Sequence, residues 1–254
     1  MTTFPLRVLC DARSHEGRVR RQNEDSYFCS PETGLWAVAD GMGGFEHGDW
    51  ASAALIGELD AEPLSEDFDT ACEQVAQRIH RANRLIFEEA GLRNARMGST
   101  IVALLTRERR FAVFWVGDSR AYLLRHGMLH QLSTDHSQVQ EMIDGGLLSS
   151  EEAANHPMSH ILARAVGVTE EVEVDVIEDE LESGDLFLLC SDGLHGCIGR
   201  DDIARLVAQP FLERIPEDLV AMTLDRGAPD NVTVVAVQFT EPTLIPQTHP
   251  AGAL

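Results

Sequence analysis

The stretch FAVFWVGDSRAYLLRHGMLHQL, residues 111–132, decides the fold class. Its apolar runs Phe111–Val116 and Ala121–Arg125 are typical of strands, and only the short turn 117–120 separates them. Consecutive strands joined by short turns pair antiparallel, whereas parallel strands need a long crossover. The stretch therefore predicts an antiparallel sheet and argues against a doubly wound parallel one.

Strand-like runs recur on both sides of this stretch. They are Arg7–Cys10, Tyr27–Cys29, Trp36–Ala39, Thr100–Leu105, Val172–Ile177, Leu186–Cys190 and Val232–Phe239. The run VEVDVI (172–177) alternates apolar and acidic residues, which predicts a half-buried strand. Strands outnumber helices, so we expect an α+β fold in which helices cover antiparallel sheets.

Helical periodicity is clearest at Val75, Ile79, Ala82 and Ile86, which predict one long amphipathic helix. A shorter apolar stripe follows Gly48-Asp49. Further short helices are expected at Glu151–Ala154, Ile161–Val166, Ile203–Ala208 and Pro216–Leu224. Residues 241–254 carry three prolines and no periodicity. We therefore predict one domain over residues 1–240, followed by a loose tail over 241–254.

Charge narrows the classes of function. The 254 residues include 20 basic residues, all arginine, and 42 acidic residues, for a net charge of −22. Without lysine the chain has no Walker A loop, no kinase strand lysine and no Schiff-base amine. The negative charge disfavours nucleic acid and anionic membranes as partners.

The cysteines and the N-terminus indicate the cellular compartment. Five cysteines form no Cys-x-x-Cys pair, which predicts reduced, mostly buried thiols rather than disulfides. The N-terminus does not resemble a signal peptide, and no apolar run approaches the length of a membrane span. We therefore expect a cytoplasmic protein.

Acidic residues lie where apolar runs meet turns. They are Glu24 with Asp25, Asp40, Asp118, Asp192 and Asp230. For one aspartate alone, a turn or a helix cap is the usual role. However, Asp40 and Asp192 directly follow residues of buried type, where a carboxylate is costly unless it is bound to something. Several such strand ends at one sheet edge would surround Mg²⁺ or Mn²⁺ with oxygen.

Histidine offers a competing metal site. His126 and His130 are four residues apart, and so are His156 and His160, which is a spacing that zinc ligands use on helices. Gly127 interrupts the first pair and a proline the second, and no cysteine lies nearby at a zinc spacing. Zinc is therefore disfavoured. The sequence has no Gly-x-Ser-x-Gly motif, so a serine nucleophile is also disfavoured.

Eight stretches in order resemble the metal-dependent protein phosphatases of the type 2C family, in its compact bacterial form. They are GRVRRQNEDS (17–26), WAVADGMGGFEHGDWAS (36–52), MGSTIVALL (97–105), VGDSRAYLLRHG (116–127), LSTDHS (132–137), ILARAVG (161–167), GDLFLLCSDGL (184–194) and GAPDNVTVVAV (227–237). The resemblance implies a four-layer α-β-β-α sandwich, with two packed antiparallel sheets flanked by helices.

The resemblance also implies a role for each matching residue. Asp40 corresponds to the carboxylate that bridges two metal ions, and the Gly41 carbonyl corresponds to a ligand of one of them. Asp192 and Asp230 correspond to ligands of the other ion.

Three more roles follow from the same resemblance. Glu24 resembles the acid that reaches a metal through water, and Asp118 with Asp192 resembles a weaker third-metal site. Arg20 matches the arginine that binds substrate phosphate, and its neighbouring arginines are interpreted as surface residues. Asp25 shares the motif without an assigned metal contact.

The implied activity is a serine/threonine protein phosphatase. It would hydrolyse phosphoserine and phosphothreonine by in-line attack of a water or hydroxide that bridges two divalent ions, Mg²⁺ or Mn²⁺, with a third ion in some members. Met42 stands where some members carry a histidine that protonates the leaving oxygen. Water or His47 could donate that proton instead, and the sequence favours water.

Partners also follow from the resemblance. We expect phosphoproteins, either substrates or the autophosphorylated form of a Ser/Thr kinase, and a monomeric enzyme. A flap over about residues 137–165 is predicted to influence substrate choice. The alternative is a non-catalytic phosphatase-like regulatory or binding module, which is disfavoured because the whole set of metal carboxylates is present.

Overall fold

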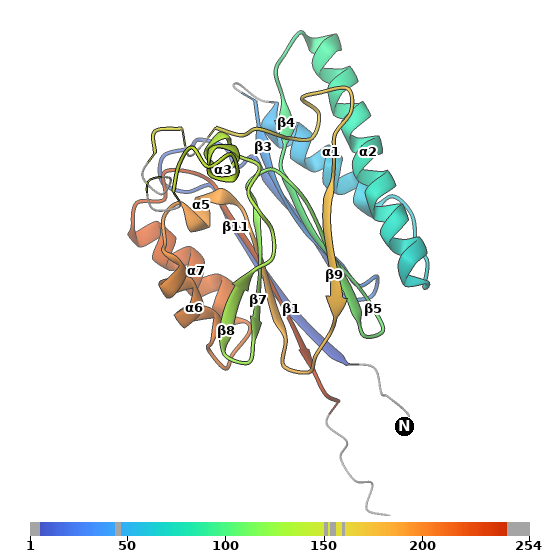
Figure 1. Cartoon of the computed structure of the whole chain (residues 1–254), viewed down its shortest axis with the longest axis vertical. Helices are drawn as coiled ribbons and strands as arrows, with labels where there is room; N and C mark the ends of the chain where they lie inside the picture. Colours follow the sequence, from blue (N-terminus) through green and yellow to red (C-terminus); the bar gives the residue numbers. More distant parts are fainter. Residues whose placement is uncertain (1–5, 44–46, 150–151, 153–155, 159–160, 243–254) are drawn as a thin grey trace, which may run out of the picture.

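Two antiparallel sheets pack face to face between two layers of helices (Figure 1). The computed structural model describes residues 6–43, 47–149, 152, 156–158 and 161–242. Of the predicted helix at 151–154 the structure describes Glu152 alone, and the tail beyond residue 242 lies outside the described residues. The four-layer α-β-β-α architecture expected from the sequence is confirmed.

The first sheet has five strands in the order β1-β11-β10-β7-β8. Their bounds are Arg7–His15 (β1), Val232–Thr240 (β11), Leu186–Cys190 (β10), Arg120–Arg125 (β7) and Met128–Gln131 (β8). β1 and β11 pair along their whole length, from Arg7 opposite Thr240 to His15 opposite Val232.

The second sheet has the order β2-β3-β5-β6-β9, with β4 paired to β3 beside this path. The bounds are Asp25–Ser30 (β2), Leu35–Met42 (β3), Ile101–Arg107 (β5), Arg110–Val116 (β6), Asp175–Glu180 (β9) and Gly98–Ser99 (β4). β2 and β3 form a hairpin in which Asp25 lies opposite Asp40.

One of the two strand pairings predicted within residues 111–132 is wrong. β7 and β8 pair as predicted, but β6 and β7 belong to different sheets. Gly117 has a φ of +106°, and a Cβ at this position would lie 2.7 Å from Thr100. The turn after β6 therefore carries the chain from one sheet to the other instead of folding it back in a hairpin.

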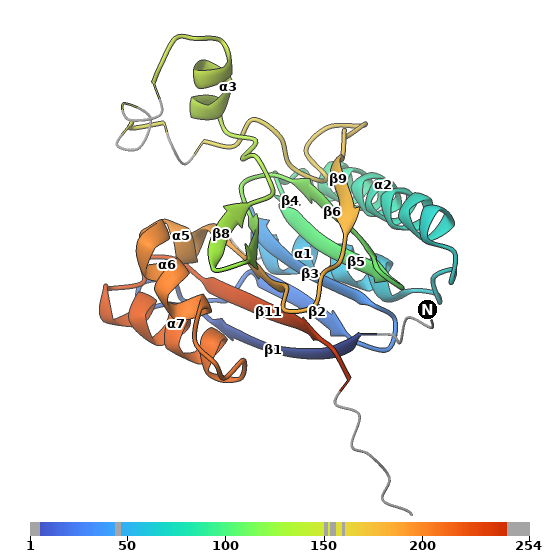
Figure 2. The ribbon, with the colours of Figure 1, turned by 60° about the horizontal axis from the view of Figure 1, so that its bottom comes forward.

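Two sets of helices cover the outer faces of the sandwich (Figure 2). On the six-stranded sheet lie α1 (Gly48–Asp60) and α2 (Phe68–Arg93), and on the five-stranded sheet lie α5 (Asp192–His195), α6 (Arg200–Val207) and α7 (Arg214–Asp225). The Asp67 side chain caps α2 by accepting a hydrogen bond from the Thr70 N–H. The short helix α3 (Gln138–Asp144) stands away from both layers, within the predicted flap.

Apolar side chains fill three separate layers. One lies between the sheets and contains Trp36, Phe187 and Phe239 at its centre. The other two lie under α1 and α2 and under α5 to α7. Because both faces of each sheet are buried, β3 and β10 read as continuous apolar runs rather than alternating ones.

Two local predictions are wrong. Residues 161–166 are not helical, because Leu162 bridges to Ser137 and Val166 bridges to Ser99. Strand β9 begins at Asp175, so the alternating run 172–177 is only partly a strand, and Val176 and Ile177 are exposed.

The cysteines follow the prediction in part. All five are unbridged, but only Cys72 and Cys190 are buried. In the described part of the chain, no helix combines the length and the hydropathy needed to span a membrane.

Candidate functional site

The predicted acidic residues come together at one end of the sandwich. Glu24 precedes β2, Asp40 lies in β3, Asp118 in the turn between the sheets, Asp192 at the start of α5, and Asp230 just before β11. Burial raises the pKa of Asp40 well above its usual range, and Asp25, Asp192, Asp118 and Asp230 raise it further. These carboxylates are therefore close enough to act on one another electrostatically.

Asp25 and Asp40 form the centre of this cluster, where Asp25 is buried and Asp40 is half-buried. They lie opposite one another on β2 and β3. Asp25 Oδ2 accepts a hydrogen bond of 2.8 Å from Ser191 Oγ, but its buried Oδ1 has no hydrogen-bond partner. Burial raises the pKa of Asp25 to about 7. An unpartnered buried carboxylate oxygen is costly, so this position suits a cation.

Asp118 lies at the crossing point between the two sheets. Burial, followed by the charge of Asp192, raises the pKa of Asp118 to about 7. Two hydrogen bonds to His136 hold the turn. The Gly117 backbone N–H donates to the ring Nδ1 of His136 at 3.1 Å, and the backbone N–H of His136 donates to the Gly117 carbonyl at 2.9 Å. His195 Nε2 lies 3.0 Å from the Asp118 carbonyl oxygen.

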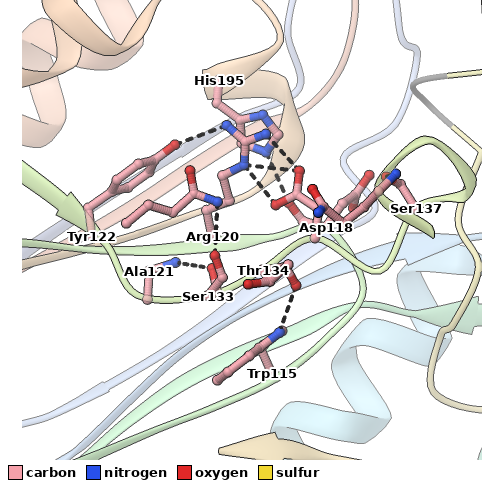
Figure 3. A network of polar contacts seen from close by, with 12 residues as sticks. Trp115, Asp118, Arg120, Ala121, Tyr122, Ser133, Thr134, Ser137 and His195 are labelled. Carbon is pink, nitrogen blue, oxygen red and sulfur yellow. Dashed lines mark hydrogen bonds and ion pairs between the residues drawn. The ribbon is translucent and has the colours of Figure 1, made fainter. Parts of the chain in front are cut away.

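Arg120 lies next to Asp118 but carries its own counter-charge (Figure 3). Its Nε and Nη2 donate to Asp135 at 2.8 Å and 2.6 Å, and its Nη1 donates to the Tyr122 hydroxyl at 3.1 Å. Since Asp135 already neutralises this guanidinium, Arg120 leaves the Asp118 carboxylate largely uncompensated.

Arg20 is the arginine that the structure brings into the cluster. Its Nη2 donates to Asp230 Oδ2 at 2.6 Å, while its side chain remains 54% exposed. Arg18 turns away instead and donates from Nε to the Leu224 carbonyl at 2.7 Å. Of these two arginines, Arg20 alone joins a guanidinium to a predicted metal ligand, as the sequence motif suggested.

Asn231 is a residue of the site that the sequence analysis missed. Its Oδ1 accepts a hydrogen bond of 2.8 Å from the Glu24 N–H. Its Nδ2 donates at 2.9 Å to the carbonyls of Glu16 and Gln22. One side chain thus fixes the loop that carries Arg20 and Glu24 against the start of β11. The only sequence signal was its place directly after Asp230.

Close backbone contacts surround Gly41. Its N–H donates to the Glu24 carbonyl at 3.1 Å, and a Cβ at this position would collide with the Gly48 carbonyl. Burial raises the pKa of Glu24, while a hydrogen bond from the Gly48 N–H, at the start of α1, opposes this shift. His47 lies beside Arg93, with 3.4 Å between its Nδ1 and the guanidinium.

The residues fit hard divalent cations. Within the described residues, no three or more His, Cys, Asp or Glu side chains are arranged as they stand to hold a metal ion. Mg²⁺ usually keeps several waters and needs few direct protein ligands. The unpartnered Asp25 oxygen and the raised pKa values of Asp40 and Asp118, caused first by burial and then by neighbouring carboxylates, mark a place where a cation would favour the charged forms. The competing zinc site gains no support, since His126 pairs with Glu182 at 3.1 Å and His160 lies outside the described residues.

A cleft of about 780 Å³ opens from the acidic cluster toward the flap. Asp118, Asp192 and Asp230 line one end, and Gln140 and Ile143 of α3 line the other. A substrate segment lying in this cleft would contact both the carboxylates and the flap helix.

Comparisons with known proteins agree with this geometry. The family model described as Protein phosphatase 2C matches residues 13–232. Serine/threonine phosphatase stp of Listeria monocytogenes is 32% identical over 237 residues, covering 89% of this chain and 94% of that protein. Serine/threonine protein phosphatase PstP of Mycobacterium tuberculosis is 34% identical over 243 residues, covering 95% of this chain and 47% of its own length. The chain thus spans about half of that relative.

Solved structures are similar over nearly the whole chain. The catalytic domain of PstP in complex with two manganese ions has a TM-score of 0.83 and 34% identity, covering 93% of this chain and 100% of that one. PppA, a key regulatory component of T6SS in Pseudomonas aeruginosa, has a TM-score of 0.85 and 36% identity. The match covers 91% of this chain and 97% of the PppA chain.

Proposed function

The chain belongs to the protein phosphatase 2C family, and from this premise we propose how its own residues carry out the reaction. It is a metal-dependent serine/threonine protein phosphatase whose cofactor is Mg²⁺ or Mn²⁺. The observation that carries the residue assignment is the position of Asp40, half-buried at one end of the sandwich, where four other carboxylates help to raise its pKa.

We assign the metal-holding role to Asp40, Asp192 and Asp230, with the Gly41 carbonyl beside them. Glu24 would act through water, and Asp118 with Asp192 would hold a weaker third ion. Two divalent ions, when bound, lower the pKa of a water between them and neutralise charge on the phosphoryl oxygens. The protein's contribution is to hold these carboxylates close together at partly buried positions, where their mutual repulsion disfavours the charged forms unless cations are bound.

Arg20 is proposed to bind the substrate phosphate. A guanidinium has five N–H donors, and toward the described residues Arg20 donates from Nη2 to Asp230 alone. The side chain is 54% exposed, and the remaining donors suit a bidentate contact with phosphate. The ion pair with Asp230 therefore orients Arg20 toward the acidic cluster without consuming its hydrogen-bonding capacity.

Asn231 is a positioning residue in this scheme. It joins the Arg20 loop to the Asp230 turn through three hydrogen bonds from one side chain. The phosphate-binding Arg20 and the metal-binding Asp230 would consequently keep a fixed position relative to each other. Met42 has no acidic hydrogen, so we propose that water protonates the leaving oxygen.

The non-catalytic alternative is disfavoured by the same residues. A binding module has no need for several buried carboxylates, because each of them costs stability. Three narrower expectations stay predictions from the sequence: a cytoplasmic location, a monomer, and an autophosphorylated kinase among the substrates. The flap is proposed to contact substrate residues through α3, which lines the cleft.

The test is phosphate release from a phosphothreonine peptide with Mn²⁺, with Mg²⁺ and with a chelator. We expect release that needs the metal and that Asp192→Asn abolishes. Asp201→Asn is the matched control, because Asp201 is an exposed aspartate on α6. Folded protein that releases no phosphate with either ion would favour the binding module. Release that survives both chelator and substitution would contradict the metal assignment.

A further inference from the structure

Cys10 and Cys29 lie on two edge strands that face each other across the sandwich. Cys10 is on β1, at the edge of the five-stranded sheet, and Cys29 is on β2, at the edge of the six-stranded sheet. Their Sγ atoms are 3.1 Å apart, and the Cys29 thiol donates a hydrogen bond to Cys10. We propose that this pair is an oxidation site, at which a disulfide bond joins the two sheets.

The geometry of Cys10 and Cys29 favours a bond between them, because their sulfur atoms are already in contact. An S–S bond is about 2.05 Å long, so the sulfur atoms need to approach by only about 1 Å. Both side chains contact the apolar layer between the sheets, whereas Cys72, Cys190 and Cys197 belong to the two outer layers. Both are also half-buried rather than buried, so a small oxidant has access to them.

Hydrogen peroxide is the class of oxidant that completes the chemistry. Cys10, which accepts the hydrogen bond, attacks one peroxide oxygen as the thiolate. The O–O bond breaks, the departing hydroxide takes up the proton that the Cys10 thiol released and leaves as water, and Cys10 becomes a sulfenic acid. The Cys29 sulfur then attacks the Cys10 sulfur, the S–S bond forms, and the second oxygen leaves as water with the Cys29 proton. Two thiols and one peroxide thus give one disulfide and two waters.

The order of attack follows from the environment of Cys29. Burial and the hydrogen bond to Cys10 raise the pKa of the Cys29 thiol to about 12. Cys29 therefore stays protonated near neutral pH and is a poor first nucleophile, because the thiolate is the reactive form. Cys10 is assigned the first step and Cys29 the second.

The bond would close a ring that contains part of the active site. Residues 10–29 include Arg20, Glu24 and Asp25. Cross-linking the ends of a loop of about 20 residues restricts the unfolded chain and stabilises the folded one. For a domain of this size, we expect the melting temperature to rise by about 5 to 10 °C.

Peroxide treatment of the full chain tests the proposal. The intact mass should fall by two hydrogen atoms, and cleavage after arginine and glutamate should yield residues 8–13 linked to residues 25–32. Cys10→Ser and Cys29→Ser should each lose the link and the rise in melting temperature, whereas Cys72→Ala should keep both. In Cys29→Ser, dimedone should label Cys10.

Two results would overturn the inference. One is a peroxide-treated wild-type protein in which these two peptides stay unlinked or in which another pair is joined. The other is a linked protein that melts no higher than the reduced one. Because the peptide map uses the wild-type chain, it decides the first point even if a serine variant does not fold.

Discussion

The two ends of strand β10 each carry a buried carboxylate, Asp185 and Asp25, but among the described residues an arginine pairs directly with Asp185 and none pairs with Asp25. At the start of β10, Asp185 is 1% exposed and accepts hydrogen bonds of 2.8 Å and 2.7 Å from Arg125. At the other end, Asp25 and Asp40 lie beside the Ser191-Asp192 segment with raised pKa values and an unpartnered Oδ1 on Asp25.

The difference distinguishes a structural acid from a functional one. Burying a carboxylate costs free energy, and the protein compensates that cost with a fixed arginine at Asp185. At Asp40 the described residues provide more carboxylates instead of a cation. A buried acid with its own arginine is complete as folded, whereas an acid packed among other acids depends on a ligand.

The largest expected effect is on catalysis, at the uncompensated end. Asp40→Asn should lower kcat/KM by about 1,000-fold or more, which corresponds to about 4 kcal/mol of transition-state stabilisation. The same substitution should leave the melting temperature of the chelator-treated protein equal or higher, because it removes one of several repelling charges. Activity assays and thermal unfolding of one sample test both parts. A folded variant with wild-type activity would remove Asp40 from the site.

At the compensated end, the expected effect is on stability instead. Asp185→Asn should lower the free energy of unfolding by about 3 kcal/mol, because it leaves the Arg125 charge without its buried partner. Activity measured well below the melting temperature should persist. Urea denaturation is the measurement. Asp179→Asn is the control, since Asp179 is exposed and 3.6 Å from Arg125. Equal stability of the two variants would refute the comparison.

A smaller catalytic effect is expected at Arg20. Arg20→Ala should lower kcat/KM by about 10- to 100-fold, since charged hydrogen bonds to phosphate contribute about 1.5 to 3 kcal/mol. Steady-state kinetics with a phosphothreonine peptide would measure it. Arg18→Ala is the control, because Arg18 donates to the Leu224 carbonyl rather than to Asp230. The phosphate-binding assignment fails if both variants lose activity equally.

The smallest effect is the pH dependence of the metal-free protein. The folded pKa values of Asp25 and Asp118, about 7, exceed the unfolded value of 3.8. The folded state therefore binds these protons more tightly, and that stability is present below pH 3.8 and is lost as the pH rises through about 7. In chelator, the melting temperature should fall by a few degrees between pH 5 and 8.

Mn²⁺ should reverse that loss, because metal binding competes with protons for the same oxygens. The gain in melting temperature on adding Mn²⁺ should be larger at pH 8 than at pH 5.5. Asp25→Asn should flatten the pH profile measured in chelator. If Asp25→Asn has the same pH profile as the wild-type protein, the pH dependence does not arise from Asp25.

Local patterns predicted antiparallel sheets covered by helices and the acids at the strand ends, whereas the family resemblance supplied the four-layer arrangement. Apolar runs of strand length mark the sheets, and a carboxylate after such a run marks a special position. The pairing of β6 with β7 was wrong because a hairpin and a crossing between sheets have the same local pattern. The outcome is decided by Gly117 and by its hydrogen bonds to His136, 19 residues away.

Long-range contacts explain the other failures. The run 161–166 has helical spacing, but its residues bridge to Ser99 and Ser137 instead. Asn231 was missed because its partners lie 207 to 215 residues away in the sequence. An Asp-Asn pair before a strand is typical of a turn. Nothing local distinguishes it from a side chain that organises a site.

The pairing of β1 with β11 has a consequence for protein engineering. The chain enters the first strand at Arg7 and leaves the last one at Thr240, and these residues are neighbours. At the rise of an antiparallel strand, they lie about 27 Å from the His15–Val232 end, which adjoins the site. A short linker could join them, and new termini could open at the exposed His126-Gly127 turn. Such a circular permutant should fold to the same sandwich, because the site depends on which strands are neighbours and not on the order of their synthesis.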